Sequence, residues 1–357
     1  MDFAAINNQI SSPDEAACTA CKARWDAVAK PLGSLGLLET AVQRIAALTG
    51  NADVSLAKRT LLVLCADNGV VREGVTQTDS SVTRQVAQSL AAGVSSVCRM
   101  AAVARCSVVP VDMGMLAPVA GVLDRRVRAG TGDIAKGPAM TRAQAEEAIQ
   151  AGIDLALAQK AAGAQIVATG EMGIGNTTTS AAVASVLLGV DPAAGAGRGA
   201  GLSDAGLARK RAALRRAVAI NRPDPDDPLG VLAAVGGLDL AGLCGVFLGC
   251  ALARVPVVVD GCISATAALA AVRLCPRAGA AMLASHLPDE PMGAPLLRAL
   301  GLEPPLHAGL RLGEGTGAVS LLPLLDMALA VYHTAGSFGD IGVVPYTPQE
   351  GSPCTRS

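Results

Sequence analysis

Aromatic side chains are scarce in this sequence, because Phe, Tyr and Trp together number only six in 357 residues. So few rings make a poor platform for stacking nucleic-acid bases, and a formal net charge of −1 offers no basic surface to a phosphate backbone. We therefore expect no nucleic-acid partner. Apolar residues still make up 51% of the chain, so its core must consist of Ala, Val, Leu and Ile. Such a core favours parallel strands covered by helices on both faces.

No stretch of the sequence is predicted to cross a membrane or to act as a secretion signal. The longest uncharged stretch lies between Glu171 and Asp191, and it includes a polar run at residues 176–179. The next, between Asp239 and Arg254, is shorter than the ~20 residues that a spanning helix needs. The N-terminal residues lack the basic segment and apolar stretch of a signal peptide. We therefore expect a cytoplasmic protein.

The ten cysteines do not predict a metal site or a disulfide framework. Most of them stand singly in apolar runs, which suits small buried side chains. Cys18 and Cys21 form one Cys-x-x-Cys pair, but no second pair or nearby histidine completes a zinc site. Without a secretion signal, structural disulfides are not expected. The sequence thus predicts neither a metal nor a cofactor.

Five short apolar runs of strand length alternate with helical stretches, which predicts βαβ units and a parallel sheet. The runs are residues 60–66, 105–111, 164–169, 255–259 and 279–284. A polar residue beside a glycine or turn follows each run: Asp67, Asp112, Glu171, Asp260 and His286. In parallel sheets the ligand lies at the carboxyl ends of the strands, so these five side chains are predicted to line one rim. The alternative is that they end strands merely as turn formers.

Residues 170–182 (GEMGIGNTTTSAA) follow a predicted strand and open a helix. Gly173 and Gly175 let backbone N–H groups converge on an anion, and Asn176 or Thr177 suits the helix N-cap. A Walker A loop needs Lys before the Ser or Thr, and here Asn precedes Thr, so the loop predicts phosphate binding without ATP hydrolysis. The structural alternative is a glycine-rich turn with a cap.

A second glycine-rich loop, at residues 195–206, leads into a helix that carries Arg209, Lys210 and Arg211. A lysine near the start of such a helix can reach back to a phosphate as a point charge. The basic cluster can equally be a solvated helix face.

Glu314 lies between Gly313 and Gly315 in the run RLGEGTGA, just before another predicted helix. A carboxylate held by glycines at a helix start can approach a substrate closely and act as a general base. The alternative is an acidic residue that complements the positive end of the helix dipole.

Several motifs occur together in the order found in one enzyme family. They are KPLGSLG (30–36), ADNGV (66–70), GEMGIGNTTTSAA (170–182), VGGLDLAGL (235–243), DGCIS (260–264), SHL (285–287) and RLGEGTGA (311–318). From about Lys30 to Pro345 the chain therefore resembles the nicotinate-nucleotide–dimethylbenzimidazole phosphoribosyltransferase family, which acts in nucleotide-loop assembly of cobalamin. The motifs at 170–182 and 311–318 are the most specific.

The resemblance implies transfer of phosphoribose from nicotinate mononucleotide to 5,6-dimethylbenzimidazole, giving α-ribazole 5′-phosphate and nicotinate with inversion at C1′. Glu314 matches the family's catalytic glutamate, which takes the N–H proton of the base, and Glu171 matches a second pocket carboxylate. The residues implied on the nucleotide and phosphate side are Gly173, Gly175, Asn176, Thr177, Lys210, Asp260, Gly313 and Gly315. Those implied on the base side are Gln85 and Ser80.

Family members are homodimers with a Rossmann-like parallel-sheet domain and a small helical domain from both chain ends. By this resemblance we expect residues 1–30 with 320–345 to form the helical domain, residues 31–319 the α/β domain, and residues 346–357 a flexible tail. Nicotinate leaves from a nitrogen that already carries positive charge, so the chemistry needs a base and a phosphate anchor rather than the metal that pyrophosphate leaving groups require.

Two departures from the family pattern leave the accepting base open. Cys262 replaces a residue that is commonly aromatic, and Ser80 lies where some members place a tyrosine. Adenine, other benzimidazoles and phenols therefore stay candidates beside dimethylbenzimidazole. Two other functions also stay open: a hydrolytic or phosphorylase-like enzyme acting at C1′, and a non-catalytic nucleotide-binding protein.

Overall fold

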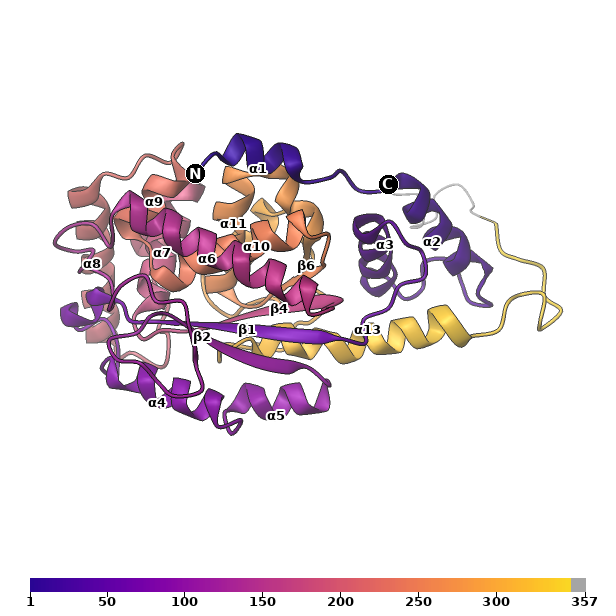
Figure 1. The fold of residues 1–357 in the computed structure, drawn as a ribbon, viewed down its shortest axis with the longest axis horizontal. Coiled ribbons are helices and arrows are strands. Elements are labelled where there is room, and N and C mark those ends of the chain that lie inside the picture. Colours follow the sequence, from indigo (N-terminus) through magenta and orange to yellow (C-terminus); the bar gives the residue numbers. More distant parts are fainter. Residues whose placement is uncertain (348–357) are drawn as a thin grey trace.

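A computed structural model describes residues 1–347 and has a single parallel sheet of six strands at its centre (Figure 1). The strand order is β3-β2-β1-β4-β5-β6, and every neighbouring pair is parallel. The strands are β1 (Arg59–Ala66), β2 (Ser107–Gly114), β3 (Leu123–Asp124), β4 (Ile166–Met172), β5 (Val257–Val259) and β6 (Met282–Ala284). All five strands predicted from the sequence are present, which confirms the α/β class.

Both faces of the sheet are covered, as the apolar strands predicted. All eight residues of β1 are buried, and alternate ones belong to different cores. Leu62 and Leu64 pack on one face, whereas Leu61 and Val63 pack on the other. This is the period of two that side chains follow along a strand. The sheet is therefore the middle layer of a helix–sheet–helix sandwich (Figure 1).

One face is covered by helices from the middle of the chain. The helices α6 (Arg142–Ala161) and α10 (Leu238–Leu252) pack on each other, α9 (Pro228–Val235) contacts α6, and α11 (Cys262–Leu274) contacts α10. The helix α7 (Asn176–Leu188) packs on α9 and α11. Glycines allow α6 and α10 to approach closely, because a Cβ on Gly245 would lie 1.9 Å from the Ile149 carbonyl oxygen. The abundance of glycine thus has a packing cause here. Further helices on this side of the fold are α8 (Asp204–Asn221) and α12 (Gly293–Ala299).

The opposite face is covered by α4 (Ser81–Ala91), α5 (Ser96–Val103) and α13 (Thr316–Thr334) (Figure 1). The residues 81–103 and 316–334 are long and apolar enough to cross a membrane by length and composition alone. That is a weak indication, because the core helix of a soluble protein passes the same test. Here α13 contacts β4, α3 and α5, and more than half of it is buried within the fold.

Helices from the two chain ends lie together beside the sheet (Figure 1). The helices α2 (Glu15–Ala27) and α3 (Leu37–Thr49) pack on each other, and α3 also contacts α13. The rings of Trp25 and Tyr332 pack against each other in a tilted arrangement, with centroids 4.8 Å apart. By contrast, α1 (Phe3–Gln9) contacts α11 of the α/β layer. The predicted division into domains stays a prediction, and residues 348–357 of the predicted tail lie outside the described residues.

Candidate active site

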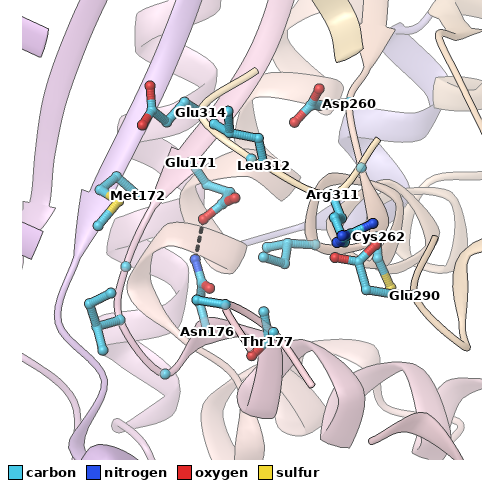
Figure 2. A pocket seen from close by; sticks show the side chains of 18 of the residues that line it. Glu171, Met172, Asn176, Thr177, Asp260, Cys262, Glu290, Arg311, Leu312 and Glu314 are labelled. Atoms are coloured by element: carbon cyan, nitrogen blue, oxygen red, sulfur yellow. Dashed lines mark hydrogen bonds between the residues drawn. The ribbon is translucent and has the colours of Figure 1, made fainter. Parts of the chain in front are cut away.

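A cavity of about 320 Å³ opens at the carboxyl edge of β4, β5 and β6. The loops that begin α7 and α13 form two of its walls (Figure 2). Most of the residues singled out from the sequence line it together: Glu171, Gly173, Gly175, Asn176, Thr177, Asp260, His286, Gly313 and Glu314. In Figure 2, Glu314 and Met172 lie to one side of Glu171, whereas Cys262, Arg311 and Glu290 lie to the other.

Glu314 is held in an unusual backbone conformation. Its φ of +59° lies in the left-handed region, and those of Gly313 and Gly315 are +89° and +91°. A non-glycine residue in this region costs free energy, and such residues cluster at functional sites. The side chain is half-buried, and its Oε2 accepts a long hydrogen bond from the Val97 backbone N–H, with 3.4 Å between N and O. Two glycines therefore permit a tight turn that presents one carboxylate to the cavity.

The turn that carries Glu314 rests directly on strand β4. A Cβ on Gly170 would lie 2.5 Å from the Glu314 carbonyl oxygen, closer than real Cβ contacts allow. From β5, Asp260 Oδ1 accepts a hydrogen bond of 2.9 Å from the Ala318 N–H in the first turn of α13. A carboxylate here satisfies an otherwise free donor and complements the helix dipole. The position of Glu314 is thus fixed by two strands of the sheet.

We predict that Gly170→Ala moves the Glu314 turn and lowers turnover by about 10²-fold, because a catalytic group displaced by about 1 Å can lose that much rate. The added methyl group meets the Glu314 backbone, which cannot yield without breaking the contact with β4. Steady-state kinetics of the variant measures the loss of turnover, and its unfolding midpoint shows whether the protein is still folded. Gly137→Ala is the control, because its Cβ meets nothing within 4 Å. Normal turnover in a folded Gly170→Ala protein would contradict the role given to this contact.

Asp260 and His286 form a buried pair behind the Glu314 turn. Burial raises the pKa of Asp260, and it lowers the pKa of His286, while the neighbouring carboxylate opposes the change at the histidine. The Ser285 hydroxyl and His286 Nδ1 lie 3.0 Å apart. A Cβ on Gly317 would collide with the His286 ring, so only glycine lets α13 begin this close to β6.

The start of α7 forms the predicted anion site. Gly175 has a φ of +96° and precedes the first helical residue. The Asn176 and Thr178 N–H groups donate to the Gly173 and Gly175 carbonyls, whereas the Thr177 N–H has no hydrogen-bond partner among the described residues. Lys210 reaches this point from α8 and donates a hydrogen bond of 2.8 Å from Nζ to the Thr177 hydroxyl. The lysine side chain is fully buried, and burial lowers its pKa to about 8. A buried cation near a free N–H group at a helix start suits a phosphate.

Glu171 and Asn176 belong to a buried cluster with a third member that the sequence did not single out. The Asn176 side-chain amide donates to Glu171 Oε2 and, over 3.1 Å, to Asp239 Oδ2 (Figure 2 draws the first of these bonds). Burial and the nearby Asp239 raise the pKa of Glu171 to about 8, although the hydrogen bond from Asn176 opposes this. Burial likewise raises the pKa of Asp239 to about 6.

The structure brings three of the five predicted rim residues to the cavity, and Asp67 and Asp112 lie away from it. Asp112 lies within β2, which runs on to Gly114, and pairs with Arg126 at 2.6 Å. Asp67 lines a separate cavity of about 420 Å³, together with Ser80.

Four predicted contacts are absent from the lining of this cavity: Gln85, Ser80, Gly315 and the buried Lys210. Gln85 is exposed on α4, and its neighbour Val86 lines the cavity instead. With Ser80 in the other cavity, the base-side roles predicted for both residues stay predictions. Gly315 lies behind the wall, against the Thr169 carbonyl.

Sequence reasoning missed several residues of the site. Glu290 lines the cavity, and burial raises its pKa. Arg198 and Arg311 line it as well, and so do residues 75–78 from the connection between β1 and α4. Asp239 had a signal, since it lies within the motif at 235–243. Arg198 and Arg311 had one too, since they lie in the glycine-rich loop at 195–206 and in the motif at 311–318. Glu290 and residues 75–78 lie outside the patterns described above. Within residues 1–347, no group of three or more His, Cys, Asp or Glu side chains is arranged to hold a metal ion.

The family model described as "Phosphoribosyltransferase" matches residues 10–343 of this chain. The chain belongs to this phosphoribosyltransferase family. It is 43% identical over 352 residues to the nicotinate-nucleotide–dimethylbenzimidazole phosphoribosyltransferase of Ruminiclostridium cellulolyticum, with 98% of this chain and 100% of the relative covered. The enzyme of that name from Acetivibrio thermocellus is 44% identical over 328 residues, with 91% and 93% covered. The crystal structure of CobT from Thermus thermophilus is 40% identical, with a TM-score of 0.88, and covers 93% of this chain and 100% of its own.

Proposed function

We propose that this phosphoribosyltransferase moves the phosphoribosyl group of nicotinate mononucleotide onto 5,6-dimethylbenzimidazole. The products are α-ribazole 5′-phosphate and nicotinate. The observation that carries the proposal is one cavity that holds Glu314 on one wall and Thr177 on another, with the buried Lys210 bonded to Thr177 behind that wall. A base and a phosphate anchor are the two groups that this reaction needs from the protein.

Glu314 acts as the general base in this proposal. One ring nitrogen of the benzimidazole attacks C1′ of the ribose, while Glu314 takes the proton from the other ring nitrogen. The bond from C1′ to the pyridinium nitrogen breaks, and its electron pair neutralises the nitrogen of nicotinate. Attack from the face opposite nicotinate inverts the configuration at C1′. The leaving group needs no proton, so one carboxylate base balances the reaction.

The phosphate of the nucleotide binds at the start of α7. The Thr177 N–H, which has no partner among the described residues, and the Lys210 ammonium support this role, because both favour an anion. Arg198 adds a further positive charge to this wall. Three other acidic side chains of the cavity would repel the nucleotide without these groups: Asp260, Glu290 and Glu314.

The accepting base occupies the side of the cavity next to Glu314. Met172 and Leu312 lie on this side (Figure 2), Val86 also lines the cavity, and these apolar side chains support a flat apolar ligand. Thr76 and Thr78 add polar groups, so the choice between dimethylbenzimidazole and other bases stays open. We further propose that the protein is a cytoplasmic homodimer and that residues 1–30 with 320–345 form a small helical domain.

The test is to identify the products by mass spectrometry after nicotinate mononucleotide is incubated with a panel of bases. The proposal predicts α-ribazole 5′-phosphate only when dimethylbenzimidazole is present, with one nicotinate released for each product molecule. Release of nicotinate without any base would identify a hydrolase instead. Binding without release under all conditions would identify a nucleotide-binding protein.

A further inference from the structure

Two buried carboxylates share one amide beside the cavity. Asn176 has a single side-chain NH₂ group, and its two hydrogens go to Glu171 and to Asp239. Asp239 is fully buried, does not line the cavity, and accepts a second hydrogen bond of 3.0 Å from the Leu240 N–H. Glu171 differs, because its Oε1 faces the cavity wall, where a Cβ on Gly313 would lie 2.8 Å from it. The Asp239 carboxylate is thus enclosed by hydrogen-bond donors, whereas the Glu171 carboxyl group has one oxygen that faces the cavity.

The charged groups that act on Glu171 are other carboxyl side chains. Those that act on it are Asp239 of α10, Asp260 after β5 and Glu290 after β6. The Cys65 thiol of β1 also faces the pair, but burial keeps it protonated because its pKa is raised. In the described part of the chain, neither Glu171 nor Asp239 receives a hydrogen bond from a Lys or Arg side chain; their donors are the Asn176 amide and the Leu240 N–H. Lys210, the nearest basic residue on α8, is bonded to Thr177 instead.

Two carboxylates this close cannot both ionise without a large cost, so the pair shares one proton at neutral pH. The negative charge stays on Asp239, which receives two N–H donors, and the proton stays on Glu171. This order agrees with the pKa of about 6 for Asp239 and about 8 for Glu171. A protonated Glu171 is a hydrogen-bond donor, whereas an ionised one only accepts.

We propose that Asp239 is a positioning residue: as a buried anion it orients the Asn176 amide and keeps Glu171 protonated, so that Glu171 donates a hydrogen bond from its cavity-facing oxygen to the bound nucleotide. The recipient is an oxygen acceptor of the nucleotide, either a ribose hydroxyl or the carboxylate of the nicotinate ring. Loss of the proton replaces this donor with a negative charge that repels an anionic substrate. The inference rests on the proposed function for the identity of the nucleotide.

The first test measures the ionisation of Glu171 directly. The protein is labelled with ¹³C at the Glu side-chain carboxyl carbons, and the signal of Glu171 is identified by its absence in Glu171→Gln. We expect a titration midpoint near 8 in the parent protein. In Asp239→Asn, which keeps the shape but removes the charge, the midpoint falls by at least about one pH unit. Asp112→Asn is the control, since Asp112 is an equally buried strand-end carboxylate that pairs with Arg126.

The second test follows KM for nicotinate mononucleotide against pH. In the parent, KM rises as the pH passes about 8, where both Glu171 and Lys210 lose their protons. In Asp239→Asn the part of the rise that belongs to Glu171 moves to lower pH by the same amount as the carboxyl signal, while the part that belongs to Lys210 stays in place. An equal loss of activity at every pH, with an unmoved midpoint, would show that Asp239 is only structural and would overturn the proposal. If Asp239→Asn does not fold, a parent midpoint below about 6 overturns it, and one near 8 supports it.

These outcomes are separate from those of the proposed function. The carboxyl titration is measured without substrate, so it stands even if the product analysis identifies a hydrolase. Conversely, formation of α-ribazole 5′-phosphate with a normal, acidic midpoint for Glu171 would leave the transfer reaction intact and would remove Asp239 from it.

Discussion

Glu314→Gln is expected to lower kcat by about 10²- to 10⁴-fold, the range that a general base contributes. Glutamine keeps the size of the side chain, the strained turn at φ +59° and the contact with β4, so the cavity retains its shape. What it loses is the ability to take the N–H proton of the attacking base. Because the proposed binding place of the phosphate is the start of α7, away from Glu314, the dissociation constant of the nucleotide is expected to change by no more than about twofold.

Single-turnover kinetics and a binding titration with nicotinate mononucleotide check this prediction. Glu290→Gln is the matched control, because it removes the same charge from the same cavity on the side away from Glu314 (Figure 2). Equal losses in the two variants would mean that net charge in the cavity, rather than a base at position 314, limits turnover. Unchanged kcat in Glu314→Gln would remove this residue from the chemistry.

The local parts of this site were predictable because each depends on a short pattern. The apolar runs gave the strands, and the parallel connection brought Glu171, Asp260 and His286 to one edge. The Gly-Glu-Gly run predicted a turn that only glycines permit, and the three positive φ angles confirm it. These features follow from backbone sterics and strand periodicity, which the sequence carries within a few residues.

The remaining parts depend on contacts between distant segments. Asp239 joins the site only because α10 packs under the start of α7, where Asn176 can reach it. Asp67 and Asp112 have the same strand-end pattern as Glu171, yet β1 and β2 place them beside the loops at 116 and 126 instead. The residues at the end of a strand do not predict which distant segments will pack against that end. The proton that we propose Glu171 and Asp239 share therefore depends on how the chain packs, and no local sequence pattern predicts it.

Lys210→Met is expected to weaken nucleotide binding and to stabilise the fold. The lysine ammonium is buried and bonded to the Thr177 hydroxyl. In the proposed function it also binds the phosphate, so its loss removes a charged hydrogen bond. Such a bond contributes about 1.5–3 kcal/mol, which corresponds to a rise in Kd of roughly 10- to 100-fold. Arg211→Met is the control, because it removes the same charge from an exposed position one residue further along α8. The Kd of Arg211→Met for the nucleotide is expected to stay close to that of the parent protein.

The stability effect has a definite pH dependence. Burial lowers the pKa of Lys210 from 10.5 to about 8, so the folded state holds its proton less tightly than the unfolded chain does. At pH 7 this difference costs the fold about 3 kcal/mol as an upper limit, and methionine removes the cost. Between pH 8 and 10.5 the unfolded state binds more protons, so the parent gains stability as the pH rises. The advantage of Lys210→Met in urea unfolding therefore shrinks across that range. A variant that is less stable than the parent at pH 7 would mean that the Nζ–Thr177 bond outweighs the desolvation of the ammonium.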